Sequence, residues 1–325
     1  MNRAKIMAAA ALAAGTAIWG APADAAEVRL RAVSSFAEGT TGSINFEKFI
    51  QKVNAEGKGL VQINYIGGPK AIPAFEVGNA VRNGVVEMAN VTGAFYTNIM
   101  PESDALKLAQ MTGPELRKNG AHDYINKVWN EKMNVQYLAR SWESTPFHLY
   151  LNKKIDKPDL TGLKLRITPV YRDFFQALGA TVVQTSPGEV YTALERGVVD
   201  GYGWPIQGIF DLGWHERTKF RVDPGFYNVE VGVLVNLNAW KRMDDKQRDF
   251  LNRMGIWLET LDADTIARNE ADRKRQAEIG IQTITLEGDA AKQYLEKAYE
   301  VGWQSIIAKS PEHGPKLRAL LSKKN

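Results

Sequence analysis

The chain has 325 residues, and 41 Lys and Arg against 37 Asp and Glu give it a formal net charge of only +4. This mild, interspersed charge argues against nucleic acid as a partner. The chain contains no cysteine, which excludes disulfides, thiol catalysis and cysteine-ligated metals. Its length is sufficient for two domains, each with its own core.

The N-terminus has the pattern of a secretory signal peptide. Arg3 and Lys5 precede an apolar run over residues 6–19, and Ala23-Asp24-Ala25 forms an A-x-A cleavage pattern. The apolar run is too short to span a membrane. We therefore expect residues 1–26 to be a signal peptide and the mature chain to be exported. A retained N-terminal anchor is the alternative.

Strands and helices alternate in the first third of the chain. The segments "VRLRAV" (28–33), "LVQINYI" (60–66) and "VEMANVT" (86–92) have the composition of strands. Between them, "SINFEKFIQKVNAEG" (43–57) and "AFEVGNAVRNG" (74–84) have helical spacing. This alternation predicts an α/β fold with parallel strands.

The middle of the chain repeats the alternation. Predicted strands are "MNVQYLAR" (133–140), "FHLYLN" (147–152), "GLKLRI" (162–167), "ATVVQT" (180–185) and "EVGVLVNLNAW" (230–240). The helix "PVYRDFFQALG" (169–179) follows the third of these. A second helix begins at "SPGE", where Ser186 and Glu189 form a capping box and Pro187 occupies the first helical position.

The segment from about Asp244 to Ile279 contains no proline and one glycine, Gly255. Its helical spacing predicts one unbroken helix of roughly 50 Å that crosses both domains. A kinked pair of helices near Gly255 is the alternative.

We expect the chain to form two domains after the signal peptide. The first comprises residues 27–150 plus about 237–265, and the second comprises residues 151–236 plus about 266–325.

Local catalytic signatures are absent from the sequence. The four histidines, at positions 122, 148, 215 and 313, lack metal-ligand spacing, and neither a G-x-S-x-G elbow nor a Walker A sequence occurs. A binding protein without cofactor or metal is therefore favoured over an enzyme. An active site built from distant residues, and a cation held by scattered oxygens, are left open.

Arg166 lies at the carboxyl end of the predicted strand 162–167. Ligands of open α/β sheets bind beyond the carboxyl ends of the strands. A guanidinium suits a carboxylate because it donates two parallel, charge-assisted hydrogen bonds. Arg166 is thus a candidate anchor for an organic acid, and a surface or interdomain salt bridge is the alternative.

The segment "GLKLRITPVYRDFFQALGATVVQTSPGEVYTALERGVVDGYGWP" (162–205) resembles the core signature of DctP-type solute-binding proteins of tripartite ATP-independent periplasmic (TRAP) transporters. The matching positions are Gly162 to Lys164, Arg166, 177–180, 188–194 and 197–201. The resemblance implies an α/β, two-domain periplasmic binding protein with a hinge and an interdomain ligand cleft. It also implies that Arg166 grips the carboxylate of the cargo and that the protein delivers this cargo to a membrane permease. A sensor component that presents its ligand to a membrane receptor is an alternative, and a secreted enzyme is another.

Two positions depart from the family pattern. Phe147 stands where many relatives carry an arginine, with His148 beside it, and Trp204 replaces an asparagine. Fewer polar partners favour a monocarboxylate with an apolar or aromatic body over a dicarboxylate or a sugar acid. The alternative is that Phe147 and Trp204 only fill the interdomain core.

Further contacts are expected where other strands end. The candidates are Phe36, Glu38, Tyr65, Gly68, Asn90, Thr92, Tyr96, Gln207 and Asn228. A structural role is the alternative for each, and we expect two or three of the set to touch the ligand. For His148, a structural role and a hydrogen bond to the cargo are both open.

Overall fold

The computed structural model describes residues 26–323, so residues 1–25 of the predicted signal peptide lie outside the described part. Nine strands form one mixed sheet with the order β2-β1-β3-β8-β4-β7-β5-β6, and β9 pairs with β8. The strands are β1 (Val28–Ser34), β2 (Val61–Tyr65), β3 (Met88–Val91), β4 (Val135–Leu151), β5 (Lys164–Ile167), β6 (Thr181–Gln184), β7 (Gly201–Pro205), β8 (Phe220–Asn236) and β9 (Gln282–Thr285).

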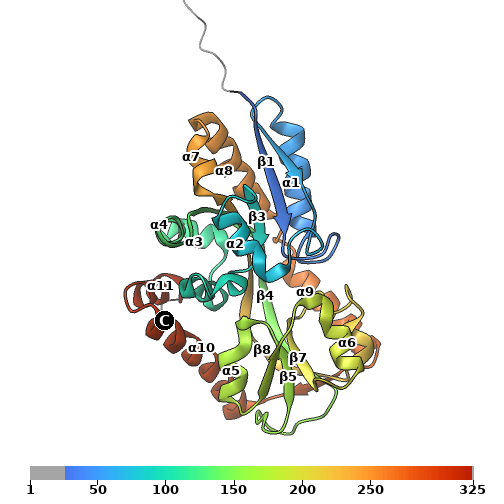
Figure 1. Cartoon of the computed structure of the whole chain (residues 1–325). Coiled ribbons are helices and arrows are strands. Elements are labelled where there is room, and N and C mark those ends of the chain that lie inside the picture. Colours follow the sequence, from blue (N-terminus) through green and yellow to red (C-terminus); the bar gives the residue numbers. More distant parts are fainter. Residues whose placement is uncertain (1–25, 324–325) are drawn as a thin grey trace, which may run out of the picture.

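Helices cover this sheet along its length (Figure 1). The α-helices are α1 (Ile44–Glu56), α2 (Val77–Arg82), α3 (Gly113–Lys118), α4 (Ala121–Met133), α5 (Arg172–Ala177), α6 (Val190–Glu195), α7 (Leu237–Arg242), α8 (Asp245–Thr260), α9 (Thr265–Glu278), α10 (Gly288–Lys309) and α11 (Gly314–Leu321). Short 3₁₀ helices are η1 (Ala74–Glu76), η2 (Gly93–Tyr96), η3 (Pro101–Leu108), η4 (Pro169–Tyr171), η5 (Pro187–Glu189) and η6 (Trp214–Arg217).

Two groups of parallel strands occupy the two ends of the sheet. In the first group β1 pairs with β2 and β3, and in the second β5 pairs with β6 and β7. We call the first group with α1, α2, α7 and α8 the first lobe, and the second group with α5 and α6 the second lobe (Figure 1). The predicted α/β fold with parallel strands is confirmed.

The long strands β4 and β8 connect the lobes. They pair antiparallel along their length, from Val135 opposite Asn236 to Leu151 opposite Phe220. The predicted strands 133–140 and 147–152 are therefore one strand, whose pairing with β8 is interrupted by register shifts at several points from Tyr137 to Leu149. Within this irregular stretch the backbone of Ser144 is left-handed, with φ of 56°, so β4 is not a regular strand where it passes between the lobes.

The buried apolar residues do not divide at the predicted domain boundaries. A large cluster extends from β3 and α4 to β5 and α5, and a smaller cluster lies between β1, β2, α1 and α8. The C-terminal α11 packs on η3 and α4, and the Leu321 carbonyl accepts a hydrogen bond from Gln110 N. The division into residues 27–150 plus 237–265 and 151–236 plus 266–325 stays a prediction.

The prediction of one unbroken helix over 244–279 is wrong. The segment forms α8 and α9, and the break lies at residues 261–264 instead of at Gly255. Asp262 explains the break, because its carboxylate accepts a hydrogen bond from Glu143 N of β4 at 2.8 Å and pairs with Arg268 at 2.6 Å. These tertiary contacts turn the chain where local spacing alone favours a continuous helix.

Gly255 instead allows α8 to lie close to β4. A Cβ at this position would meet Leu138 Cγ and Ala139 Cβ at 3.2 Å. Gly255→Val should therefore lower the free energy of unfolding by about 1–3 kcal/mol through overpacking, measured by urea denaturation. Ile256→Val, on the exposed side of the same helix, is the matched control. Equal losses in the two variants would show that the close approach is not a constraint.

Candidate functional site

The carboxyl ends of strands from both lobes meet at a narrow inner cavity. Phe36 follows β1, Thr92 follows β3, Thr168 follows β5, and Trp204 lies near the end of β7. The remaining lining residues are Phe95, Trp142, Phe147, Val170, Tyr171, Pro205, Val229, Glu230 and Val231. The cavity therefore lies where the strand topology places ligands in open α/β sheets.

Arg166 lies behind the Trp204 wall of this cavity and is completely buried. Its Nη2 donates to the Thr185 carbonyl at 2.7 Å, and its Nε donates to Thr185 Oγ1 at 3.3 Å. Nη1 has no hydrogen-bond partner among residues 26–323. Tyr171, which lines the inner cavity, interacts with the same guanidinium, but Nη1 is desolvated and forms no hydrogen bond of ordinary geometry within the described residues.

The charge of Arg166 is poorly compensated. Burial lowers the pKa of its guanidinium to about 10, against smaller opposing effects from Tyr171 and Glu189. One oxygen of the Glu189 carboxylate, Oε2, closes the predicted capping box by accepting from Ser186 N and Oγ at 2.9 and 2.8 Å, and Glu189 forms no ion pair with Arg166. A buried cation without a counterion is costly, so an anionic ligand would be strongly favoured at this point.

Other polar atoms around the site also lack partners. Ser35 Oγ, Thr168 Oγ1 and Trp204 Nε1 are buried and form no hydrogen bond with any described residue. Buried polar groups are nearly always satisfied by protein or by bound molecules. Together with Arg166 Nη1, these atoms can all donate hydrogen bonds. The arrangement suits a ligand rich in acceptor oxygens.

A larger outer cavity of about 330 Å³ shares Phe36, Trp142 and Trp204 with the inner one. Its lining is mostly apolar, with Lys70, Asp211, Ser35 and Ser186 among its polar side chains. The other lining residues are Ala37, Thr40, Thr41, Gly42, Pro69, Pro73, Ala74, Pro187, Gly188, Gly208 and Leu212. An apolar body could occupy this space while a polar group points inward.

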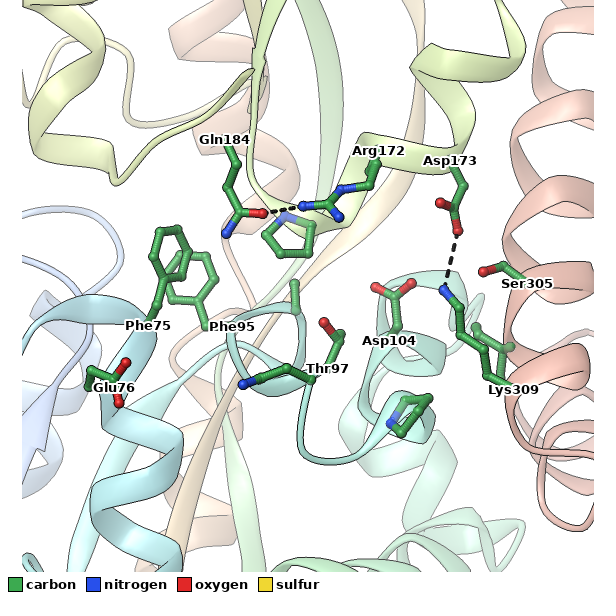
Figure 2. A pocket seen from close by; sticks show the side chains of 15 residues that line it. Phe75, Glu76, Phe95, Thr97, Asp104, Arg172, Asp173, Gln184, Ser305 and Lys309 are labelled. Carbon is green, nitrogen blue, oxygen red and sulfur yellow. Dashed lines mark hydrogen bonds and ion pairs between the residues drawn. The ribbon is translucent and has the colours of Figure 1, made fainter. Parts of the chain in front are cut away.

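A third cavity, of about 400 Å³, shares Phe95 with the inner one, but more of its lining side chains are charged. In Figure 2, Arg172, Asp173 and Gln184 lie on one side and Glu76, Thr97 and Asp104 on the other, with Lys309 reaching between them. Lys309 lies 3.8 Å from Asp173, and Arg172 donates to Gln184. Because its basic groups have partners and acidic groups face it, this cavity suits an organic anion less well than the inner one.

The structure brings four predicted site residues together at the inner cavity: Phe36, Thr92, Phe147 and Trp204. Arg166 is in the lining of neither the inner nor the outer cavity but lies beside Trp204, with Cζ 5.7 Å from the ring centroid. Gln207 lines a neighbouring cavity and donates to Asn269 at 2.6 Å. Their roles in ligand binding stay predictions.

The other predicted contacts lie outside the lining of the inner and outer cavities. Asn90 bonds Ser34, Gly42 and Ser141, and the Tyr96 hydroxyl accepts from Trp129. Asn228 donates to the Ala109 carbonyl at 3.1 Å.

His148 is also buried, with Nδ1 2.9 Å from Asp223 and 3.0 Å from the Val222 carbonyl, and burial lowers its pKa. These contacts agree with the structural alternative for His148.

Sequence reasoning missed Trp142, Tyr171 and Trp214, which surround the site. Trp142 comes from the irregular part of β4, Tyr171 from η4 and Trp214 from η6. Trp142 lies two residues after the predicted strand 133–140 and Tyr171 four residues after the predicted strand 162–167, so the strand-end rule could have found both. Trp214 follows no predicted strand. Within the described part of the chain, His, Asp and Glu side chains form no group of three suited to a metal ion.

Residues 33–310 match the family model described as bacterial extracellular solute-binding protein, family 7, DctP. This match covers most of the chain, so the chain belongs to this family of solute-binding proteins. The predicted class, a TRAP-type binding protein and not an enzyme, is thereby confirmed. Proteins of this class are periplasmic, bind small organic acids and work with membrane permease subunits. Within residues 26–323, no helix is both long and apolar enough to cross a membrane.

Individual relatives agree with this assignment. A monocarboxylate 2-oxoacid-binding periplasmic protein of Nostoc sp. is 27% identical over 236 residues, which cover 68% of this chain and 64% of the relative. The TRAP solute-binding protein of Desulfovibrio salexigens with bound orotic acid has a TM-score of 0.79 at 20% identity, covering 90% of this chain and 97% of its own. A Bordetella pertussis extracytoplasmic solute receptor binding pyroglutamic acid has a TM-score of 0.80 at 18% identity, and the match covers 91% of this chain and 100% of the receptor. The predicted fold is therefore confirmed.

If Arg166 is uncompensated in the ligand-free protein, its removal should not destabilise the fold. We expect Arg166→Met to raise the free energy of unfolding by roughly 1 kcal/mol, because a buried charge is replaced by an apolar chain. Arg221→Met is the control, since the equally buried Arg221 pairs with Asp223 at 3.0 Å. That variant should lose at least ~1 kcal/mol. Chemical denaturation measures both, and a large loss in Arg166→Met would contradict the description of this site.

Proposed function

We propose that the protein is a periplasmic receptor for an organic monocarboxylate with an apolar or aromatic body, which it delivers to a TRAP permease. The observation that carries this proposal is the Arg166 guanidinium, buried behind the inner cavity with one nitrogen unpartnered among the described residues. A carboxylate at this point would supply both the missing acceptor and the missing negative charge.

The neighbouring donors suggest how the acid is oriented. One carboxylate oxygen would accept from Arg166 Nη1, and a second oxygen or a 2-oxo group would accept from Thr168 Oγ1 or Trp204 Nε1, both unpartnered. The apolar body would extend past Trp204 into the outer cavity, where burial contributes about 25 cal/mol per Å². The Nostoc relative, described as binding monocarboxylate 2-oxoacids, supports this ligand class.

Binding requires the lobes to separate. The inner cavity holds about 20 Å³, room for about one water molecule. Two hydrogen bonds join the segments that flank the lobes. Thr41 N, between β1 and α1, donates to Asp211 Oδ2, between β7 and η6, at 2.7 Å, and Lys107 Nζ of η3 donates to the Val170 carbonyl of η4 at 2.5 Å. We therefore expect an open form that admits the acid and a closed form that the bound acid stabilises.

The ligand class can be tested by thermal-shift screening of 2-oxo and 2-hydroxy monocarboxylates against dicarboxylates and sugar acids. A ligand that binds the folded state raises the melting temperature, by mass action, with increasing concentration. We expect 4-methyl-2-oxopentanoate or phenylpyruvate to raise it at millimolar concentration, and malonate or glucuronate to leave it unchanged. Shifts with dicarboxylates alone would contradict the proposed ligand class.

The anchor can be tested by calorimetric titration of Arg166→Lys with the best acid from that screen. A lysine keeps the charge but loses the planar pair of donors, so affinity should fall at least about tenfold. Arg172→Lys is the matched control, since Arg172 lines the third cavity, and it should bind as the wild type does. If the Arg172 variant loses affinity and the Arg166 variant does not, the carboxylate is bound in the third cavity.

A further inference from the structure

Trp214 is a second indole that lies beside the proposed anchor, Arg166. Its indole is 1% exposed and lies with its ring centroid 5.7 Å from Arg166 Cζ. Trp204 lies at the same distance, 5.7 Å, from the same atom. The two indoles meet edge to face, with centroids 4.5 Å apart and planes at 71°. The two indoles therefore lie on the same side of the guanidinium and form a corner against it.

The position of Trp214 is fixed by the chain around it. Gly213 adopts a left-handed conformation, with φ of 74°, immediately before η6. The Trp214 carbonyl accepts from Thr218 Oγ1 at 2.9 Å, and that hydroxyl lies 2.7 Å from the Tyr202 hydroxyl of β7. Tyr202 is the register partner of Arg166 and packs on Trp214 with ring centroids 5.2 Å apart. Trp214 is thus tied to the strand beside the anchor.

We infer that Trp214 is a positioning residue, which holds the Arg166 guanidinium charged and correctly oriented until a carboxylate arrives. The electron-rich face of an indole attracts a cation, most strongly where water is excluded. An acidic side chain in the same place would neutralise Arg166 and compete with the ligand, whereas an indole stabilises the charge and leaves Nη1 free. This inference rests on the proposed function, because it concerns the anchor of that same site.

Trp204 and Trp214 differ in whether they line the inner and outer cavities. Trp204 lines both the inner and the outer cavity, so its substitution would alter ligand contact directly. Trp214 lines neither cavity, so any effect on affinity has to pass through Arg166 or Trp204. Trp214→Phe keeps an aromatic face toward the guanidinium, and Trp214→Leu removes it.

The experiment compares Trp214→Phe, Trp214→Leu and a control, Trp129→Leu, by titration with phenylpyruvate. Trp129 is a fully buried indole of α4 whose Nε1 donates to Tyr96, so this variant reports general loss of packing. We expect Trp214→Leu to bind about tenfold more weakly, and the other two to stay within about threefold of wild type. Wild-type affinity in Trp214→Leu, or an equal loss in all three variants, would overturn the inference.

A second measurement does not depend on a ligand. In protein labelled with ¹⁵N-arginine, the Arg166 Nε–Hε signal is identified by its loss in Arg166→Lys. Ring currents of the two indoles should displace this signal in the wild type and in Trp214→Phe, and Trp214→Leu should move it toward the position of exposed arginines. An unmoved signal in Trp214→Leu would overturn the inference even if no monocarboxylate binds. Failure of Arg166→Lys to weaken binding would instead contradict the proposed function.

Discussion

The guanidinium of Arg166 is buried without a carboxylate partner among the described residues, and its surroundings follow from that constraint. Thr185 accepts two of its hydrogen bonds, two indoles lie together on one side of it, and Glu189 is engaged in a helix cap. Such a cation is expensive to bury. In the proposed receptor, a bound anion would offset this free-energy cost of burial, and the offset would strengthen its binding. The same burial lowers the pKa of Arg166, because it disfavours the charged guanidinium.

The fold makes this arrangement possible by bringing strand ends from two lobes to one place. The strands β4 and β8 run through both lobes, and their irregular pairing near Ser144 lies at the passage between them. Phe36 and Thr92 come from the first lobe, and Trp204 comes from the second. A ligand that contacts all three walls stabilises the closed form relative to the open one. Membership of the solute-binding family agrees with this behaviour.

Much of this could be predicted from sequence because the signals are local. Alternation of apolar residues located the short parallel strands, and Ser186 with Glu189 located a helix start that the structure shows with both bonds of the capping box. The position of Arg166 at a strand end followed in the same way. The break between α8 and α9 could not be predicted, because it depends on Asp262 reaching Glu143 of β4. Trp214 could not be found either, since it reaches Arg166 from a turn 48 positions later in the chain.

The most direct measurement is a crystal structure of the protein with its cargo, obtained by co-crystallisation with the tightest-binding acid or by purification from the native host. We expect a carboxylate oxygen about 2.8 Å from Arg166 Nη1, with the carbon skeleton of the acid extending past Trp204. A carboxylate bound to Arg172 or Lys70, with no ligand oxygen within hydrogen-bond distance of Arg166 Nη1, would contradict the proposal.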